Sequence, residues 1–240
     1  LDALRLRRRR APCHAPEGGD LFDTSGNGVK LVDGMHLKVS TDVFVPRGAT
    51  RAVAEAALSL TLPRRPRVID LTVGCGNVLL SVLRRLPEAR GVGMDINEAA
   101  PALALENARA QGLEARASFW AGDLRQLPEL LADDARASHG PFDLVVATPP
   151  YHPDRSTRLA SYAGDALRFA SGASQVTSMY GAVAEAVQAP GVMSPSGYVV
   201  VQAPPGEQAD VAGVFVGQGS YVVHSLGQHV ATLRLRQEEK

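Results

Sequence analysis

The sequence has few cysteines, little lysine and no long hydrophobic run, and each shortage excludes a class of protein. Two cysteines among 240 residues exclude a disulfide scaffold and a multi-cysteine zinc module, and they suit a reducing compartment such as the cytoplasm. No predominantly apolar run reaches the roughly 18 residues of a membrane span, so we expect no membrane contact. Glycine (23) and proline (16) are too few for a collagen-like or low-complexity chain.

The charges are balanced, with 25 basic and 25 acidic residues. A net charge of zero disfavours nucleic acid as a partner that would contact the whole surface. Only three of the basic residues are lysine, which is typical of a bacterial genome rich in GC. The single charge run, Arg7–Arg10, lies in residues 1–20. We interpret these residues as a basic tail or linker, or else as a contact for an anionic partner. Because the chain begins at Leu1 rather than Met, we expect its natural start to lie upstream.

Two further regions are expected. Residues 21–47 hold a short β-prone run beside turn residues, which predicts a β-hairpin lead-in. Residues 48–240 alternate short apolar runs with helical stretches, which predicts an α/β domain with a mostly parallel sheet and helices on both faces. The seven expected strands are 68–73, 91–96, 117–120, 142–147, 198–201, 221–225 and 231–236, and the main expected helices are 48–60, 77–86, 98–111 and 174–188.

A glycine turn follows the first strand of the domain and opens a helix, in the run Asp70-Leu-Thr-Val-Gly74-Cys75-Gly76. Glycines allow a ligand to approach the backbone, and the free N–H groups of a helix N-terminus face it. A purely structural turn stays open as an interpretation. A nicotinamide-dinucleotide site is disfavoured because Leu79 occupies the place of the third glycine. We expect Cys75 to be a packing residue rather than a nucleophile.

Two carboxylates follow the next two strands, where a parallel sheet binds its ligands. Asp95 ends the second strand, 19 residues after Gly76, and can accept hydrogen bonds from both hydroxyls of a ribose. Asp123 follows the third strand and can accept from an adenine amino group, while Asp70 can order the glycine turn. Each acid alone would be an ordinary strand-end residue or helix cap. The ordered set predicts an adenosine-containing ligand, with Trp120 as a pocket wall or core residue.

The fourth strand ends in the run Thr148-Pro149-Pro150-Tyr151-His152. The prolines remove two N–H donors, so the carbonyls of Thr148 and Pro149 are expected to accept hydrogen bonds from a ligand. Tyr151 adds a flat face and a hydroxyl group. Such a loop can hold a planar group that carries an NH₂. His152 is either a base for a cationic amine or an exposed loop histidine.

Together these motifs resemble the class I S-adenosylmethionine-dependent methyltransferases of the HemK/PrmC type, which are protein-glutamine N-methyltransferases. The resemblance extends over about residues 36–236 and rests on Val43–Thr50, Asp70–Gly76, Gly93–Ile96 with Asn107–Ala108, Phe142–Tyr151 and Gly197–Gln202, with Gln208 after it. Three positions depart from the family's motifs. Thr148 replaces the asparagine of NPPY, Thr72 the first glycine of motif I, and Arg51 a glutamate near the lead-in.

The resemblance implies a Rossmann-like fold and S-adenosyl-L-methionine as the cofactor. It assigns cofactor binding to Asp70, Gly74, Gly76, Asp95 and Asp123, and catalysis to Thr148, Pro149 and Tyr151. It assigns substrate binding to Phe44, Pro46 and His152, and it implies no metal.

Four functions stay open at this point. The first is an N-methyltransferase acting on an amine or amide nitrogen of a small molecule or a protein side chain. The second, motivated by Thr148 and the short segment before the lead-in, is a repurposed member that catalyses another displacement, such as intramolecular amine ring closure in antibiotic-type natural-product biosynthesis, with a partner chain. The third is a non-catalytic subunit that retains the fold for binding. The fourth is an enzyme that modifies a nucleic-acid base, which the neutral charge disfavours.

Overall fold

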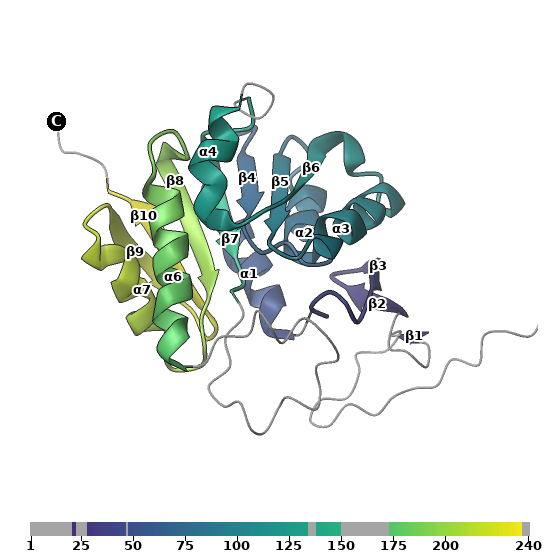
Figure 1. The fold of residues 1–240 in the computed structure, drawn as a ribbon, viewed down its shortest axis with the longest axis horizontal. Helices are drawn as coiled ribbons and strands as arrows, with labels where there is room; N and C mark the ends of the chain where they lie inside the picture. Colours follow the sequence, from purple (N-terminus) through teal and green to yellow (C-terminus); the bar gives the residue numbers. More distant parts are fainter. Residues whose placement is uncertain (1–20, 23–27, 47, 134–137, 150–172, 237–240) are drawn as a thin grey trace, which may run out of the picture.

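A seven-stranded sheet with helices on both sides forms the centre of the molecule (Figure 1). The computed structural model describes residues 21–22, 28–46, 48–133, 138–149 and 173–236. The strands are β4 (Arg67–Asp70), β5 (Arg90–Asp95), β6 (Ala117–Ala121), β7 (Phe142–Ala147), β8 (Met193–Gln202), β9 (Tyr221–Leu226) and β10 (Val230–Leu235). Their order is β6-β5-β4-β7-β8-β10-β9. The first five strands are parallel and β10 is antiparallel to both neighbours, which confirms the predicted Rossmann-like sheet.

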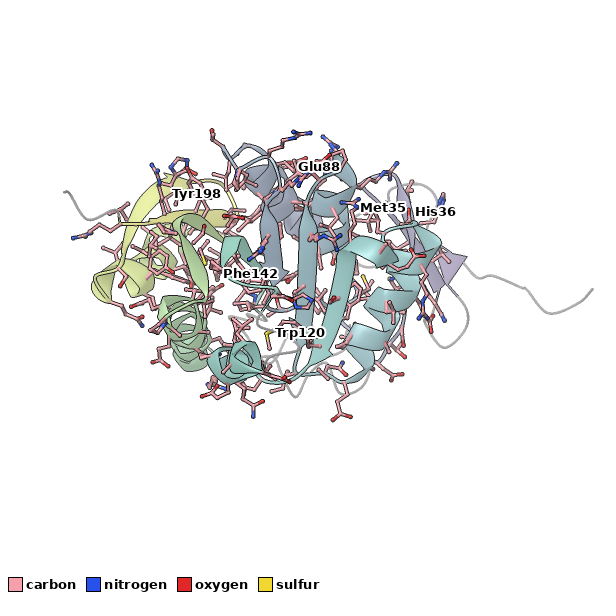
Figure 2. All side chains as sticks on the ribbon, turned by 90° about the horizontal axis from the view of Figure 1, so that it is seen from above. Met35, His36, Glu88, Trp120, Phe142 and Tyr198 are labelled. Carbon is pink, nitrogen blue, oxygen red and sulfur yellow. The ribbon has the colours of Figure 1, made fainter. Side chains whose placement is uncertain are left out.

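Helices cover both faces of this sheet because its strands are apolar on both sides. In β7, Leu144 and Val146 belong to one buried cluster, and Val145 and Ala147 belong to the other. The first cluster lies under α1 (Gly48–Leu58), α2 (Asn77–Arg85) and α3 (Ala99–Ala110). The second lies under α4 (Leu127–Ala132), α6 (Ala173–Gln188) and α7 (Gln208–Gly217). Figure 2 shows side chains filling both layers, with Trp120 in the second cluster.

The predicted elements agree with the structure to within a few residues, with three differences. β8 begins earlier than expected, because Pro195 and Gly197 made its first half resemble a loop. α4 has only six residues, too few to show a helical period, and it follows the 3₁₀ turn η2 (Leu124–Gln126). α7 is rich in valine and glycine without a clear polar face, so only the family resemblance pointed to it. A second 3₁₀ turn, η1 (Glu114–Arg116), precedes β6.

The lead-in is a small antiparallel sheet of β1 (Leu21–Phe22), β2 (Gly28–Val32) and β3 (Met35–Val39). Asp33 and Gly34, with φ of 48° and 73°, make the tight turn between β2 and β3. Alternate residues of β3 are buried in the first cluster, so the hairpin shares the core of the α/β domain. The boundary between residues 21–47 and 48–240 stays a prediction, and residues 1–20 lie outside the described part.

Asn107 of α3 fastens this hairpin to the glycine turn. Its Oδ1 accepts from Lys38 N at 2.7 Å, and its Nδ2 donates to Lys38 O at 2.9 Å and to Cys75 O at 2.8 Å. Only 1% of Asn107 is exposed, so these three backbone groups depend on it for their hydrogen bonds. The position of the lead-in is therefore coupled to the loop after β4. Within the described ranges, no helix is both long and apolar enough to cross a membrane.

Candidate functional site

The carboxyl ends of four parallel strands bring most of the predicted site residues to one edge of the sheet. The chain runs from β4 outward through β5 to β6, and then returns to β7 on the other side of β4. The connections on either side of this switch point leave in opposite directions, and open parallel sheets generally bind their ligands at such a point. The glycine turn follows β4, and Thr148 follows β7, so the two meet across this switch point.

The glycine turn requires glycine at two positions. Gly74 and Gly76 have φ of +52° and +89°, in the left-handed region that side chains rarely adopt. A Cβ on Gly76 would also lie 3.1 Å from Leu80 Cδ1 and 3.3 Å from the Cβ of Ala104. Gly76 N donates to Val73 O at 2.8 Å, which closes the turn, and Gly76 O accepts from Leu80 N as α2 begins. The backbone before α2 therefore carries no side chain at Gly74 or Gly76, and the side chain of Cys75 between them is buried.

Asp95 holds the glycine turn from the neighbouring strand. Its Oδ2 accepts from Gly74 N at 2.9 Å and its Oδ1 accepts from Asn97 N at 3.0 Å. Burial raises the pKa of this carboxyl group, and the N–H groups that it accepts from oppose that rise. Each oxygen of a carboxylate has two lone pairs, so Asp95 keeps acceptor capacity beyond these bonds.

Asp70 lies beneath the turn and is 1% exposed. Its Oδ1 accepts from Thr72 N at 3.1 Å. Burial, opposed by the N–H of Thr72 and reinforced by the negative charge of Asp95, raises the pKa of Asp70 from 3.8 to about 7. A carboxyl group in this position orders the loop from below and changes its charge near neutral pH.

Cys75 is buried, and burial raises the pKa of its thiol to about 12. A thiol that stays protonated is a poor nucleophile, which fits the expected packing role. Trp120 is also a core residue, with its ring 5.3 Å from that of His139 in an edge-to-face arrangement.

Asp123 immediately precedes η2 and is its N-cap. Its Oδ1 accepts from Arg125 N at 2.9 Å, its Oδ2 pairs with Arg125 Nη1 at 2.9 Å, and Gln126 completes a capping box. Gly122 N donates to Asp95 O at 3.0 Å, so this loop lies beside the end of β5. The structure therefore gives Asp123 the helix-cap role that the sequence left open, and its role toward an adenine stays a prediction.

Thr148 contacts Thr72 across the switch point. Thr148 N donates to Thr72 Oγ1 at 2.7 Å, and the two hydroxyl oxygens are 3.3 Å apart. Pro149 is buried. Pro150, Tyr151 and His152 lie outside the described residues. Sequence reasoning noted Thr72 only as a departure from a motif, although a hydroxyl between two apolar residues at a strand end was a visible signal.

The segment after β3 passes over the same edge. Asn97 Nδ2 donates to Asp42 O at 2.6 Å, which ties the segment to the turn after β5. A Cβ on Gly74 would lie 3.8 Å from Phe44 O, so the backbone of Phe44 is beside the glycine turn. The side chain of Phe44 is 41% exposed and Pro46 is buried. Sequence reasoning missed Asn97, whose role depends on this distant contact.

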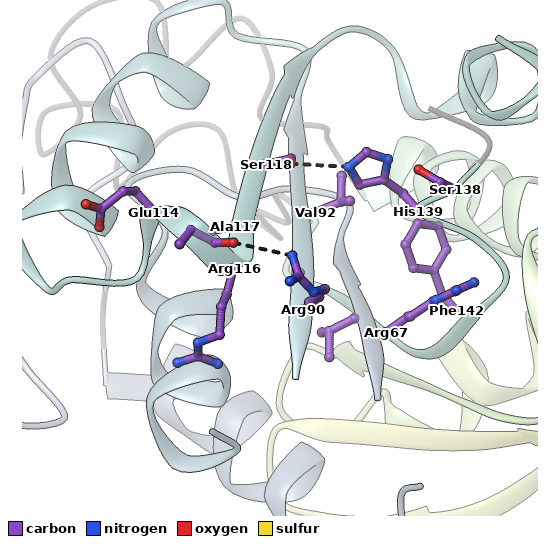
Figure 3. A pocket seen from close by; sticks show the side chains of 13 residues that line it. Arg67, Arg90, Val92, Glu114, Arg116, Ala117, Ser118, Ser138, His139 and Phe142 are labelled. Atoms are coloured by element: carbon purple, nitrogen blue, oxygen red, sulfur yellow. Dashed lines mark hydrogen bonds between the residues drawn. The ribbon is translucent and has the colours of Figure 1, made fainter. Parts of the chain in front are cut away.

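Two cavities lie away from this edge. One of about 320 Å³ lies at the amino ends of the parallel strands, and its lining includes Arg67, Arg90 and Phe142 (Figure 3). Arg116, which lines this cavity, donates hydrogen bonds to the backbone carbonyl oxygens of Leu83, Leu86 and Ala89. The other, of about 270 Å³, lies between α1, α2 and the turn of the hairpin.

Comparisons with known proteins identify the family of this fold. Residues 65–211, from the glycine turn's strand into α7, match the family described as "Methyltransferase domain". The fold resembles TrmN from Thermus thermophilus (TM-score 0.53, 20% identity, 79% of this chain and 50% of that one). It also resembles TYW2 of P. horikoshii in complex with MeSAdo (TM-score 0.55, 12% identity, 90% of this chain and 72% of that one). The chain therefore belongs to the methyltransferase domain family.

Curated relatives specify the branch of this family. A release factor glutamine methyltransferase of Rhodospirillum rubrum is 36% identical over 183 residues, covering 74% of this chain and 52% of that protein. The one from Mycobacterium leprae is 34% identical over 154 residues, covering 64% of this chain and 46% of that protein. The chain is thus a HemK-like member of the class I methyltransferases, and it spans about half the length of these relatives.

Proposed function

We propose that this chain binds S-adenosyl-L-methionine at the carboxyl edge of its sheet and transfers the methyl group to a nitrogen of a small molecule or a protein side chain. The observation that carries the proposal is the placement of the glycine turn, Asp95 and Thr148 around one switch point. Membership of the methyltransferase domain family and the relatives named release factor glutamine methyltransferase support it.

The residues at this edge fit such a cofactor. Gly74 and Gly76 leave the backbone bare beside the N-terminus of α2, where a bulky ligand needs room. Asp95 retains lone pairs for ribose hydroxyls while it holds the turn in place. Asp123 lies on the adjacent loop, with acceptor capacity left for an amino group. When bound, the cofactor supplies a methyl group on a positively charged sulfur.

The chain's own contribution is alignment rather than acid–base chemistry. We assign the orientation of an acceptor nitrogen to Thr148, the carbonyl of Pro149 and Tyr151. We assign the binding of the substrate to Phe44, Pro46 and His152. Good alignment of two reacting groups contributes about 7–11 kcal/mol to lowering a barrier. The alternative is a repurposed enzyme that would use the same residues for another displacement, and Thr148 in place of an amide side chain favours it.

Calorimetric titration with S-adenosyl-L-methionine tests the cofactor site. Asp95→Asn should weaken binding by about 5- to 150-fold, because ribose donors would lose a charged acceptor. The matched control is Asp143→Asn at the amino end of β7, which also accepts two hydrogen bonds, from Arg67 N and Ser194 Oγ. It should leave the affinity unchanged.

Absence of binding by the wild-type chain, or an equal loss in the two variants, would contradict the proposal. Release of S-adenosylhomocysteine together with a methylated acceptor would distinguish methyl transfer from the repurposed alternative.

A further inference from the structure

The crossing segment, residues 40–46, passes over the carboxyl edge of the sheet and lies against it at two points. At the first point, Asn97 Nδ2 donates to Asp42 O at 2.6 Å. At the second, a Cβ on Gly74 would lie 3.8 Å from Phe44 O. The crossing segment is therefore bonded to the turn after β5 and lies beside the glycine turn after β4.

Asp95 connects the same two points from below. Its Oδ2 accepts from Gly74 N at 2.9 Å, and its Oδ1 accepts from Asn97 N at 3.0 Å. Both residues that contact the crossing segment are thus held by the carboxylate to which we assign the ribose of the cofactor. Hydroxyl groups that donate to Asp95 would fix this carboxylate, and with it the two backbone N–H groups that it accepts from.

The amide of Asn97 has one orientation that satisfies its neighbours. Its Oδ1 accepts from Ala99 N at 3.1 Å as α3 begins, and its Nδ2 donates to Asp42 O. The reversed amide would set donor against donor at Ala99 N and acceptor against acceptor at Asp42 O. The direction of both hydrogen bonds is therefore determined.

We propose that Asn97 is a positioning residue that couples cofactor binding at Asp95 to the order of the crossing segment. This inference rests on the proposed function and adds how its site is assembled. The crossing segment carries Phe44 and Pro46, to which we assign the binding of the substrate. Local opening of the segment disturbs, through Asn97, the carboxylate that holds the cofactor, so a bound cofactor opposes the opening.

Hydrogen exchange measures this coupling. A ligand that must dissociate before a segment opens slows exchange by a factor of one plus the ratio of free ligand to Kd. At a free concentration of S-adenosyl-L-methionine about ten times the Kd, exchange in the wild-type chain should therefore slow about tenfold. The slowing should appear in the crossing segment at Val43 N, which donates to Ser40 O at 3.2 Å, and in the glycine turn at Gly76 N, which donates to Val73 O at 2.8 Å.

Two variants of Asn97 separate the coupling from the cofactor site, each measured at about ten times its own Kd. Asn97→Asp removes the donor to Asp42 O and keeps an oxygen for Ala99 N. In this variant the cofactor should still slow exchange about tenfold in the glycine turn, and it should no longer slow exchange in the crossing segment. Asn97→Ser loses the amide donor without gaining a charge and should behave in the same way.

Gln111→Glu is the matched control. Gln111 Nε2 donates from the end of α3 to His36 O of the lead-in at 3.2 Å, so this variant also removes an amide donor to the backbone of the lead-in. Because Gln111 contacts the hairpin rather than the crossing segment, the slowing should persist in both places.

In the wild-type chain, slowing of the glycine turn alone would overturn the inference and leave the cofactor site standing. Slowing of the crossing segment that persists in both Asn97 variants would also overturn it, because the cofactor would then act on the segment without Asn97. The same holds if Gln111→Glu abolishes the slowing, since any weakening of the lead-in would then suffice. If calorimetry shows no binding by the wild-type chain, the proposed function fails first, and this inference fails with it.

Discussion

Replacement of Asp70 by asparagine should remove a large decrease in the free energy of unfolding that accompanies a rise in pH. The side chain is 1% exposed and lies under the glycine turn, where its Oδ1 accepts from Thr72 N. Burial raises its pKa from 3.8 to about 7, with Asp95 adding to the rise. Asparagine has the same shape and keeps an oxygen for Thr72 N, but it cannot ionise.

The sign follows from the two pKa values. Because the folded state holds the proton more tightly, the stabilisation from Asp70 is complete below about pH 4 and is lost as the pH rises through about 7. A difference between 3.8 and about 7 corresponds to at most about 4 kcal/mol in the free energy of unfolding. Asp70→Asn should therefore gain stability relative to the wild type from pH 4 to pH 7, and the gain should level off above pH 7.

Urea unfolding at several pH values, followed by the fluorescence of the single tryptophan, measures this difference. Subtraction of the wild-type curve removes the contribution of every other titrating group. Thr232→Val, at a buried threonine of β10 that does not ionise, is the control and should give a flat difference. A flat difference for Asp70→Asn as well would refute the assignment of a buried carboxyl that titrates near neutral pH.

Two further variants test the packing and the attachment of the lead-in, both by urea unfolding. Gly93→Ala would place a Cβ 2.5 Å from Val73 Cγ2, so it should lower the free energy of unfolding by about 1–3 kcal/mol. Gly213→Ala in α7 has open space around it, so it should instead raise the free energy of unfolding by up to about 1 kcal/mol. Asn107→Ala leaves three backbone groups unpaired and should lower the free energy of unfolding by about 2–5 kcal/mol. Glu106→Ala at the neighbouring position removes only an exposed ion pair, so it should change the free energy of unfolding by less than about 1 kcal/mol. Equal effects within either pair would contradict the corresponding contact.

The elements and the class of the fold could be predicted from the amino-acid sequence, because they depend on local patterns. Short apolar runs separated by helical periods predict a covered parallel sheet, and the strand of β7 was predicted with the bounds that the structure has. The glycines at 74 and 76 predicted a bare turn because few other residues adopt their backbone angles. Asp95 was placed at the edge by its position at a strand end.

How these groups use their hydrogen bonds depends on contacts between residues that are distant in the sequence. The contact between Thr72 and Thr148 depends on the register of β4 and β7, which no local pattern specifies. Asp123 caps the 3₁₀ turn η2 that follows it. The raised pKa of Asp70 depends mainly on its burial in the folded chain. Local spacing determines which residues reach the edge of the sheet, whereas burial and partners distant in sequence determine what each of them can donate, accept or ionise.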